Sequence, residues 1–546
     1  MNILPLGECA VLIELEDRLD PAVNGRVRAL ARHLRDLPGV EDVVPALRSV
    51  TVVFDPLTAD PAVIAETAEQ VLPGLTPQAG TTGRTFEVPV AYGGAAGPDL
   101  EETAASLGLS AEQFIRIHGG VEYTVFMLGF TPGFPYLGIL PEEIRVPRLP
   151  VPRVRVPEGS VAVADAMTGI YPLTSAGGWR LIGRTPLAIY DPRQADPVLF
   201  RPGDRVRFIP APPSPVPERP GPSPLPLPRR PVFEVRSAGL YTTVQDAGRR
   251  GYRHLGVPSS GAMDPLALWA ANTAVGNPPG VPALEVTAPG PVLRVLEHTT
   301  VALAGADLSP RLDGAEIEQG VALFLRPGQT LEFGAPRRGM WTYVAVAGGV
   351  DATTALGSAS TYVPGLLGGS GGRRLQDGDV IGAGPPPPTR RKVVPAEQVP
   401  LPAHSLTVRV IPGPQDEWLT EEGRGAFLKQ EWRISPQRDR AGVRLEGVPL
   451  AHRRSGEFLS DGVIPGAIQV PSGGRPIIIM ADGPTTGGYP KAAVVIAADL
   501  RLVAQAPPRA VLRFRPVTLE EALEALREQR ARMGTRRAET APEDRE

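Results

Sequence analysis

The densest group of side chains that could do chemistry lies in the first half of the chain, around His118. This histidine ends a predicted helix, and two glycines separate it from Glu122, which begins a strand-like segment. Acid–base catalysis needs two such groups within reach of one another, so we predict that His118 and Glu122 handle protons. In the structural alternative, His118 only caps the helix C-terminus and Glu122 is exposed.

Aromatic and glycine-rich segments follow this histidine. Glycines let backbone amides approach an anion closely, and Arg184 supplies a planar fork that suits a carboxylate or a phosphate. We interpret these segments as pocket walls, although the same residue types also pack turns and form surface ion pairs. The predicted binding residues of the first half are Tyr123, Phe134, Tyr136, Thr168, Tyr171 and Trp179.

Polar residues are also concentrated between residues 242 and 264, at the start of the second half. Asp264 precedes a proline and an alanine-rich run, which is typical of a helix N-cap. Capping does not account for the other polar residues of the segment, for which a turn with a surface ion pair is the structural alternative. The predicted binding residues here are Gln245, Asp246, Arg249, His254 and Ser260.

A Thr-Thr-Gly-Gly turn followed by Lys491 lies near the end of the second half. Its hydroxyls, free amides and ammonium could converge on an anion, although a solvated turn has the same composition. We predict that Lys491 is catalytic. The predicted binding residues around it are Gln469, Thr485, Thr486 and Tyr489.

Several common kinds of site are excluded by the sequence. It has no phosphate-binding G-x-x-x-x-G-K-[ST] loop, no H-E-x-x-H zinc helix and no G-x-S-x-G nucleophile elbow. None of the six histidines is spaced from another like a pair of metal ligands. Cys9 is the only cysteine, so an intrachain disulfide or a multi-cysteine metal site is excluded as well.

Charge and hydropathy limit the partners and the location. A formal net charge of -3 gives no electrostatic reason to expect nucleic acid or an anionic membrane as a partner. The N-terminus lacks the basic and apolar regions of a signal peptide, and no apolar run approaches about 18 residues. With a single thiol, these features predict a soluble protein of the cytoplasm.

The elements that must position these residues are short. The 61 glycines and 64 prolines among 546 residues favour many short strands over long helices, so we expect a mainly β protein with some α+β structure. The length corresponds to roughly three or four domains.

The first 84 residues predict a small α+β domain. Asp20-Pro21 and Asp60-Pro61 mark the starts of two helices, because Asp caps a helix and Pro suits its first position. With β-like runs at 10–15, 43–44, 50–54 and 86–90, the order is βαββαβ. That order is typical of a ferredoxin-like module.

The remainder divides at proline-rich breaks. Short β-like segments predict a small barrel over 85–210, in which Ser110 and Gln113 form a capping box that opens a helix. An extended proline-rich linker is expected over 211–231. The predicted units beyond it are 232–395, 403–516 and a C-terminal segment, 517–546, made of a helix and a disordered tail.

An internal echo indicates related barrels in both halves. Residues 156–172 and 470–490 share Val-Pro-x-Gly, an apolar run, Ala-Asp and Thr-Gly-x-Tyr-Pro, in that order. Two copies of one strand-turn-strand unit would produce this pattern. Chance is the alternative in a chain so rich in glycine and proline.

The longest of these motifs resemble two partner families. Residues 118–137, 168–172 and 177–186 resemble the allophanate hydrolase subunit 1 family, also described as KipI-like or as the B subunit of 5-oxoprolinase. Residues 242–264, 413–416, 460–471 and 485–491 resemble the subunit 2 family, also described as KipA-like or as the C subunit of 5-oxoprolinase. The chain is thus similar to a natural fusion of the two.

This resemblance implies cyclophilin-like β-barrels, one in the first half after the small α+β domain and a tandem pair in the second. It also implies a part in the ATP-dependent cleavage of 5-oxoproline to glutamate, together with a separate A subunit of the LamB/YcsF type. The sequence departs from the family pattern at residues 165–167, where glycines and a glutamine are expected. A missing glutamine amide would remove one donor and one acceptor from the pocket.

Roles follow from this resemblance and from residue type. We expect Arg184, Lys491 and the turn 485–487 to contact phosphate or carboxylate groups. Mg²⁺ is expected with ATP, held by Asp461. Two other functions remain open, a biotin-dependent carboxyltransferase related to urea carboxylase and a KipI-type regulator of a histidine kinase. Copies of the chain could also assemble as a homo-oligomer.

Overall fold

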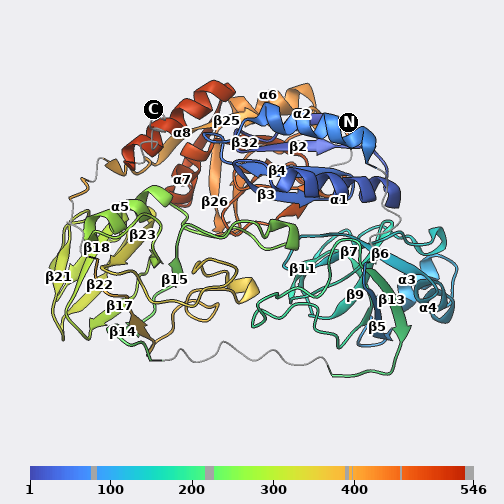
Figure 1. Ribbon diagram of the computed structural model, residues 1–546, viewed down its shortest axis with the longest axis horizontal. Coiled ribbons are helices and arrows are strands. Elements are labelled where there is room, and N and C mark those ends of the chain that lie inside the picture. The colour runs from blue at the N-terminus through green and yellow to red at the C-terminus, as the bar shows by residue number, and fades with distance from the viewer. Residues whose placement is uncertain (76–82, 216–226, 388–392, 396–397, 455–457, 535–546) are drawn as a thin grey trace, which may run out of the picture.

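The computed structural model describes residues 1–75, 83–215, 227–387, 393–395, 398–454 and 458–534. It is mainly β with short helices, and it contains two closed seven-stranded barrels (Figure 1), which confirms the predicted fold class. Among the described helices, none is long and apolar enough to cross a membrane. The middle of the predicted linker and the predicted disordered tail lie outside the described residues.

The N-terminal unit is an antiparallel sheet of four strands with two helices packed on it. Its strands in sheet order are β1 (Asn2–Pro5), β2 (Ala10–Glu14), β4 (Ser49–Phe54) and β3 (Val40–Pro45), and its helices are α1 (Pro21–Arg35) and α2 (Pro61–Val71). Both predicted caps are confirmed, because the Asp20 and Asp60 carboxylates accept hydrogen bonds from the first turns of these helices.

The element order of this unit differs from the predicted βαββαβ. β1 precedes the first predicted strand, and the last predicted strand is β5 (Thr85–Tyr92) of the following barrel, where it pairs in parallel with β13 (Arg205–Pro210). Apolar alternation identifies a strand but not the sheet it joins, because pairing depends on partners far along the chain. The order is therefore ββαββα.

The first barrel closes around a core of aliphatic and aromatic side chains. Its strands, in order around the barrel, are β5, β13, β6 (Glu122–Leu128), β7 (Pro135–Gly138), β10 (Met167–Ile170), β9 (Ser160–Ala164) and β12 (Arg180–Arg184). Helices α3 (Leu100–Ser106) and α4 (Ala111–Gly119) connect β5 to β6, and β8 (Arg153–Val156) pairs with β11 (Ser175–Gly177) in a small sheet. The predicted capping box of Ser110 and Gln113 opens α4.

The unit that follows is made of two sheets rather than a closed barrel. One sheet contains β20 (Ala315–Glu316), β19 (Pro310–Leu312), β22 (Thr330–Phe333), β17 (Val292–Val295), β14 (Pro231–Ser237) and β24 (Val380–Gly382). The other contains β15 (Tyr241–Gln245), β16 (Ala283–Thr287), β23 (Arg338–Val346), β18 (Thr299–Asp307) and β21 (Leu323–Leu325). Helix α5 (Pro265–Val275), which Asp264 caps as predicted, packs on the second sheet. The described part of the second half thus has one closed barrel, not the expected tandem pair.

The second closed barrel has the strand order of the first. Its strands, in order around the barrel, are β25 (Ser405–Pro412), β33 (Val511–Pro516), β26 (Trp432–Arg438), β27 (Gly442–Glu446), β30 (Ile477–Ile479), β29 (Ala467–Gln469) and β32 (Lys491–Val495). In both barrels the first and last strands along the chain pair in parallel. The other elements of this region are α6 (Glu421–Lys429), β28 (Asp461–Gly462), β31 (Thr486–Gly487), α7 (Ala497–Gln505) and α8 (Leu519–Arg532).

The internal echo does not mark equivalent strands. Residues 156–172 cover β9 and β10, whereas residues 470–490 cover β30 and β31, and β30 takes the barrel position of β10. The two halves do contain the same barrel topology, but the two repeated segments cover strands at different positions of the barrel.

The N-terminal unit packs against the second barrel and α8. Figure 1 shows the N-terminal sheet beside the second barrel, with the first barrel and the two-sheet unit below them. Leu6 and Ala10 pack with Val463 and Val494 of the second barrel, and Arg530 of α8 bonds Asp55 at 2.8 and 2.9 Å. The N-terminal unit therefore joins the first half of the chain to the second half through apolar packing and an ion pair.

Candidate functional site

The two barrels contact each other through the predicted threonine turn. The Phe130 backbone N–H, in the loop after β6, donates to Thr486 Oγ1 of β31 at 3.0 Å. The Tyr136 hydroxyl of β7 is hydrogen-bonded to the side chains of Ser460 and Thr486. Residues that the sequence separates by about 350 positions thus form one junction.

An aromatic cluster forms the first-barrel side of this junction. Phe134 lies edge-on to Tyr136, Tyr171 and Trp179, with ring centroids 5.1 to 5.4 Å apart. Tyr136 and Trp179 are each 8% exposed, so the cluster is almost closed to solvent. Gly169 packs against the Phe134 and Trp179 rings, and a side chain there would overlap them. The predicted aromatic residues are therefore brought together, as a packed wall.

A buried ion pair forms the second-barrel side. Lys491 Nζ of β32 donates to Asp461 Oδ1 of β28, and both side chains are buried. Gln415 holds the pair in place, because its Nε2 donates to Asp461 Oδ2 at 3.2 Å and its Oε1 accepts from the Lys491 backbone N–H at 3.2 Å. The antiparallel pairing of β28 with β31 positions Asp461 opposite Gly487, in the turn that precedes Lys491.

Burial drives the two pKa values of this pair toward each other. It lowers the pKa of Lys491, which the Asp461 charge only partly offsets, and it raises the pKa of Asp461, which the Lys491 charge only partly offsets. Burial thus favours the neutral form of the pair, while the mutual attraction of the two charges favours the ionised form. Such a pair can take up a proton in one step and release it in the next.

Unused hydrogen-bonding groups surround the pair. Gln469, opposite Lys491 on β29, has an unpartnered Nε2, and the buried Oγ1 atoms of Thr485 and Thr51 also lack partners among the described residues. Thr51 comes from β4 of the N-terminal unit and abuts Gly462. Because buried polar groups are normally satisfied, these atoms indicate room for a small polar ligand or water.

The expected magnesium ligand does not fit this geometry. Asp461 accepts a hydrogen bond from Lys491 on Oδ1 and one from Gln415 on Oδ2, so a cation would have to share both oxygens with these donors. Among the described residues, no group of three or more His, Cys, Asp or Glu side chains could hold a metal ion. These contacts do not favour Asp461 as a Mg²⁺ ligand.

Comparisons with known proteins assign both halves. Residues 1–200 match the family model for the carboxyltransferase domain, subdomain C and D, and residues 255–516 match that for subdomain A and B. The 5-oxoprolinase C subunit of Escherichia coli (strain K12) is 39% identical over 298 residues, which are 55% of this chain and 95% of that protein. The 5-oxoprolinase B subunit of Escherichia coli O157:H7 is 44% identical over 208 residues, 38% of this chain and 94% of that protein.

The chain belongs to the family of the 5-oxoprolinase B and C subunits. Its first half is similar to the B subunit and its second half to the C subunit, and one polypeptide joins this B-like half to this C-like half. The crystal structure of a protein named TTHA0988 has a TM-score of 0.83 at 39% identity, and the match covers 93% of this chain and 99% of that one. The urea carboxylase of Kluyveromyces lactis has a TM-score of 0.53 at 32% identity, and the match covers 56% of this chain but only 29% of that one.

In the C-like half, the segment 245–261 gathers four of the predicted binding residues. Asp246 accepts hydrogen bonds from Ser358, Ser360 and two backbone amides, so its carboxylate organises a turn. Arg249 donates to the Ser360 carbonyl, Gln245 to the Thr361 carbonyl, and Ser260 backbone N–H to the Ala481 carbonyl. His254 lies apart from them, and burial, with Arg35 and Arg201 nearby, lowers its pKa to about 4.

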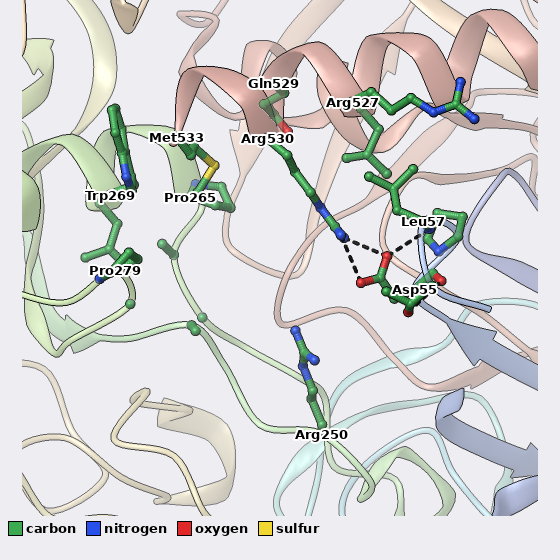
Figure 2. A pocket seen from close by; sticks show the side chains of 18 of the residues that line it. Asp55, Leu57, Arg250, Pro265, Trp269, Pro279, Arg527, Gln529, Arg530 and Met533 are labelled. Atoms are coloured by element: carbon green, nitrogen blue, oxygen red, sulfur yellow. Dashed lines mark hydrogen bonds and ion pairs between the residues drawn. The ribbon is translucent and has the colours of Figure 1, made fainter. Parts of the chain in front are cut away.

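A cavity of about 1270 Å³ opens beside this segment. It is lined by the C-like half, by the loop after β4 of the B-like half and by α8. Figure 2 shows Arg530 pointing from α8 to Asp55, with Arg250 below them and Trp269 on the opposite wall. Asp246 and Ser260 are among the lining residues, so the cavity reaches the predicted binding segment.

The predicted acid–base pair of the B-like half is not formed. His118 is fully buried in the first barrel, where it contacts the Tyr92 hydroxyl at 2.8 Å and Thr168 Oγ1 at 3.0 Å. Burial lowers its pKa to about 3, so it is neutral near pH 7. Tyr123, which donates to the His118 carbonyl, lies in the same core, so this binding candidate also packs the barrel.

Glu122 and Arg184 also lie outside the junction contacts. Glu122 faces outward and pairs with Arg205 at 2.9 Å, because the two glycines after His118 end the helix and start a new strand direction. Arg184 Nε donates to the Glu158 carbonyl at 2.9 Å, a contact within the first barrel. Tyr489 is half-buried between β31 and β32, two residues before Lys491.

Sequence reasoning missed the residues that complete the site. Gln415 lay within the resembling motif 413–416, but its polar side chain was not assigned a role. Ser460 directly precedes Asp461 and also lay within a resembling motif, 460–471, without an assigned role. Thr51 gave none, because it occupies an ordinary position in a β-like run and meets the site only through the packing of β4 on β28.

Proposed function

We propose that the chain is the B and C component of an ATP-dependent 5-oxoprolinase, which cleaves 5-oxo-L-proline to L-glutamate. One observation carries this proposal: each half matches more than nine tenths of a separate protein of the 5-oxoprolinase complex. The proposal includes ATP and Mg²⁺ and, as the partner, a separate A subunit of the LamB/YcsF type. The Mg²⁺ arrives bound to the ATP phosphates, since Asp461 is engaged by Lys491.

The chemistry proposed for the junction is proton transfer. A lactam is a weak electrophile, so phosphorylation of its oxygen by ATP activates the ring carbon toward water. When water adds, it loses a proton to the Asp461 carboxylate. When the C–N bond breaks, the nitrogen takes a proton from Lys491, and the hydroxyl left on the ring carbon returns a proton to Lys491 as it becomes the carbonyl of the acyl phosphate. Asp461 then gives its proton to the released amine. A second water then releases the phosphate, giving glutamate, ADP and phosphate.

Neighbouring groups support this assignment. The spare donor of Gln469 and the hydroxyls of Thr485 and Thr51 can bind the oxygens that gain charge during the reaction. The aromatic wall of Phe134, Tyr136, Tyr171 and Trp179 limits access of bulk water, which protects an activated intermediate from side reactions.

A reconstituted assay tests the proposal. The purified chain is mixed with a LamB/YcsF-type homologue, 5-oxoproline and Mg-ATP, and ADP and glutamate are followed together. Glutamate formed in step with ADP supports the proposal, with Lys491→Leu as the matched inactive control. ADP without glutamate, or neither product, contradicts it.

A second candidate is a biotin-dependent carboxyltransferase component. It is favoured by the carboxyltransferase family models and by the likeness to the Kluyveromyces lactis urea carboxylase, whose remaining length would have to come from partner chains. A parallel reaction with a carboxylated biotin carrier and urea tests it. If the carrier loses its carboxyl group only when the chain and urea are both present, this function replaces the first. A KipI-type regulatory role stays a prediction that would require both reactions to fail.

A further inference from the structure

Arg249 is a buried cation for which the described residues supply no contacting counter-charge. Its side chain is 2% exposed, its Nη2 donates to the Ser360 carbonyl, and its Nε and Nη1 have no partner among the described residues. Asp246 is its sequence neighbour, but that carboxylate is occupied by two serine hydroxyls and two backbone amides. A buried guanidinium normally has an anion in contact, because desolvation of an unpaired charge is costly.

Two other buried arginines of the same half contact carboxylates, whereas buried Arg253 donates to a carbonyl and a hydroxyl. Arg440 contacts the carboxylates of Asp482 and Glu285, and Arg501 contacts that of Asp264. Although burial lowers the pKa of Arg440, these carboxylates raise it above its ordinary value, whereas for Arg249 burial dominates and lowers it. Arg249 thus has the burial of a paired arginine but lacks the pair.

Two further unpartnered atoms lie on the same segment. Gln245 Nε2 donates to Thr243 Oγ1 and to the Thr361 carbonyl, which fixes the amide and leaves its Oε1 as a free acceptor among the described residues. Ser260 Oγ is buried and unpartnered as well. Gln245 and Arg249 bond the adjacent carbonyls of Thr361 and Ser360, and the Arg249 backbone N–H donates to the carbonyl of Ser259, the residue before Ser260.

The cavity reaches this trio at Ser260. Ser260 lines the cavity of about 1270 Å³. Its backbone is in the left-handed region, with φ of 54°, so the chain turns at this residue. The trio is distinct from the Lys491–Asp461 pair, since Arg253 lies between them, bonded to the Val463 carbonyl on one side and to Ser259 Oγ on the other. A ligand held by the trio would therefore occupy a second site.

The three free groups define the ligand chemistry. Two N–H donors on a cation call for a carboxylate, a free amide oxygen calls for an N–H on the ligand, and a hydroxyl suits a carbonyl or carboxylate oxygen. We propose that Arg249, Gln245 and Ser260 form a binding site for a small carboxylate that also carries an N–H group. The substrate and the product of the proposed function, 5-oxoproline and glutamate, both have this chemistry, and this choice of probes rests on that function.

Calorimetric titration of the full-length chain tests the site directly. We expect 5-oxoproline or L-glutamate to bind. Arg249→Met should raise the dissociation constant at least tenfold, and Ser260→Ala should raise it about threefold to tenfold. The carboxylate-free lactam 2-pyrrolidone should bind at least tenfold more weakly than 5-oxoproline. The comparison of the two carboxylates identifies the source, substrate or product. Arg294→Gln, in the same half but outside the cavity lining, exposed and paired with Glu234, is the control and should leave affinity within about twofold.

Thermal unfolding separates a binding role from a structural one. Because Arg249→Met removes an unpaired buried charge, we expect an unchanged or higher melting temperature for the free variant, together with loss of the ligand-induced rise seen for the parent chain. The proposal is overturned if neither carboxylate binds the parent up to about 10 mM, or if Arg249→Met binds with the parental affinity. Glutamate production with unaltered Arg249→Met binding would reject the site alone, and binding without glutamate production would reject the proposed function alone.

Discussion

The two closed barrels share one topology but differ at two corresponding positions. In the first barrel His118 stacks on Phe208 with centroids 4.6 Å apart, and the Tyr123 hydroxyl donates to the His118 carbonyl at 3.0 Å. In the second, Phe427 stacks on Phe514 at 4.5 Å, and Trp432 Nε1 donates to the Phe427 carbonyl at 3.0 Å. His118 and Phe427 therefore do the same packing work at the same place.

At the second position, the first barrel has the apolar residue and the second barrel the polar one. Gly183 of β12 pairs with Tyr92, and Ala493 of β32 pairs with Pro412 at the same barrel position. Two residues earlier on each strand, Leu181 in the first barrel corresponds to Lys491 in the second. Leu181 packs into the aromatic cluster, whereas Lys491 forms the buried pair with Asp461.

This comparison separates scaffold from chemistry. A histidine that replaces a core phenylalanine is still a core residue, and its two ring contacts make its burial tolerable. A lysine that replaces a core leucine instead requires a carboxylate partner, and Asp461 and Gln415 supply the polar surroundings. The candidate chemistry therefore belongs to the second barrel, on the face that meets the first.

The largest effect is expected when the buried Lys491–Asp461 pair of the second barrel is removed. Asp461→Asn removes the group that accepts a proton while keeping its shape, so glutamate formation should fall about 100-fold or more. Steady-state rates of ADP and glutamate release measure this. Asp416→Asn, partly exposed beside Gln415, is the control and should keep nearly full activity. Equal losses in both variants would argue against a specific role for Asp461.

A smaller effect is expected for the residue that positions the pair. Gln415→Leu removes a donor to the Asp461 carboxylate, which raises the pKa of Asp461 further and shifts the acidic limb of the rate profile to higher pH. We expect about a tenfold loss at neutral pH that is partly recovered in alkali. Gln430→Leu, at the edge of the same barrel, should move neither rate nor profile. A uniform loss at every pH would indicate damage to packing instead.

Stability should reveal the structural role of His118. Its folded pKa of about 3 lies below that of an exposed histidine, so protonation favours the unfolded chain. Stability should be unaffected by this group above about pH 6.5 and should fall by up to about 1.4 kcal/mol per pH unit between there and its folded pKa. His118→Phe should remove that slope. It should also lower the free energy of unfolding by about 1–3 kcal/mol near pH 7, because the buried hydroxyls of Tyr92 and Thr168 each lose a hydrogen-bond partner.

Denaturant unfolding at several pH values measures this as the difference between the parent and His118→Phe. Carboxylates titrate in both proteins, so their contribution cancels in the difference. An identical pH dependence of the two proteins would show that His118 is not held neutral.

The smallest effect is expected outside both cores. Glu122→Gln changes an exposed side chain paired with Arg205, so activity should stay within about twofold and the melting temperature nearly constant. The same rate assay and a thermal scan measure both. A large loss of activity would restore Glu122 as a proton carrier and contradict the comparison of the barrels.

Local signals in the sequence predicted the local structure well. Asp20 and Asp60 cap their helices as expected, since capping depends on residues within one turn. The sheet to which residues 86–90 belong was predicted wrongly, because parallel pairing with β13 joins segments about 120 residues apart. Spacing also misled at Glu122, where the helix ends before the side chain can reach His118.

The candidate site was predicted in its members but not in its pairing. Lys491 and Asp461 were both selected, yet as a phosphate contact and a metal ligand, because nothing in the sequence shows that β28 folds against β31. Thr486 and Tyr136 were selected from different halves, and only the contact between the barrels joins them. Side-chain type could be read along the chain, whereas partnership depends on long-range packing.

The most direct test exchanges each residue for its counterpart in the other barrel. His118→Phe and Lys491→Leu are assayed side by side with a LamB/YcsF-type homologue, and the rate of glutamate formation is measured after both are shown to be folded. We predict that His118→Phe retains activity within a few-fold while Lys491→Leu loses about 100-fold or more. Loss of activity in His118→Phe with retention in Lys491→Leu would contradict the account.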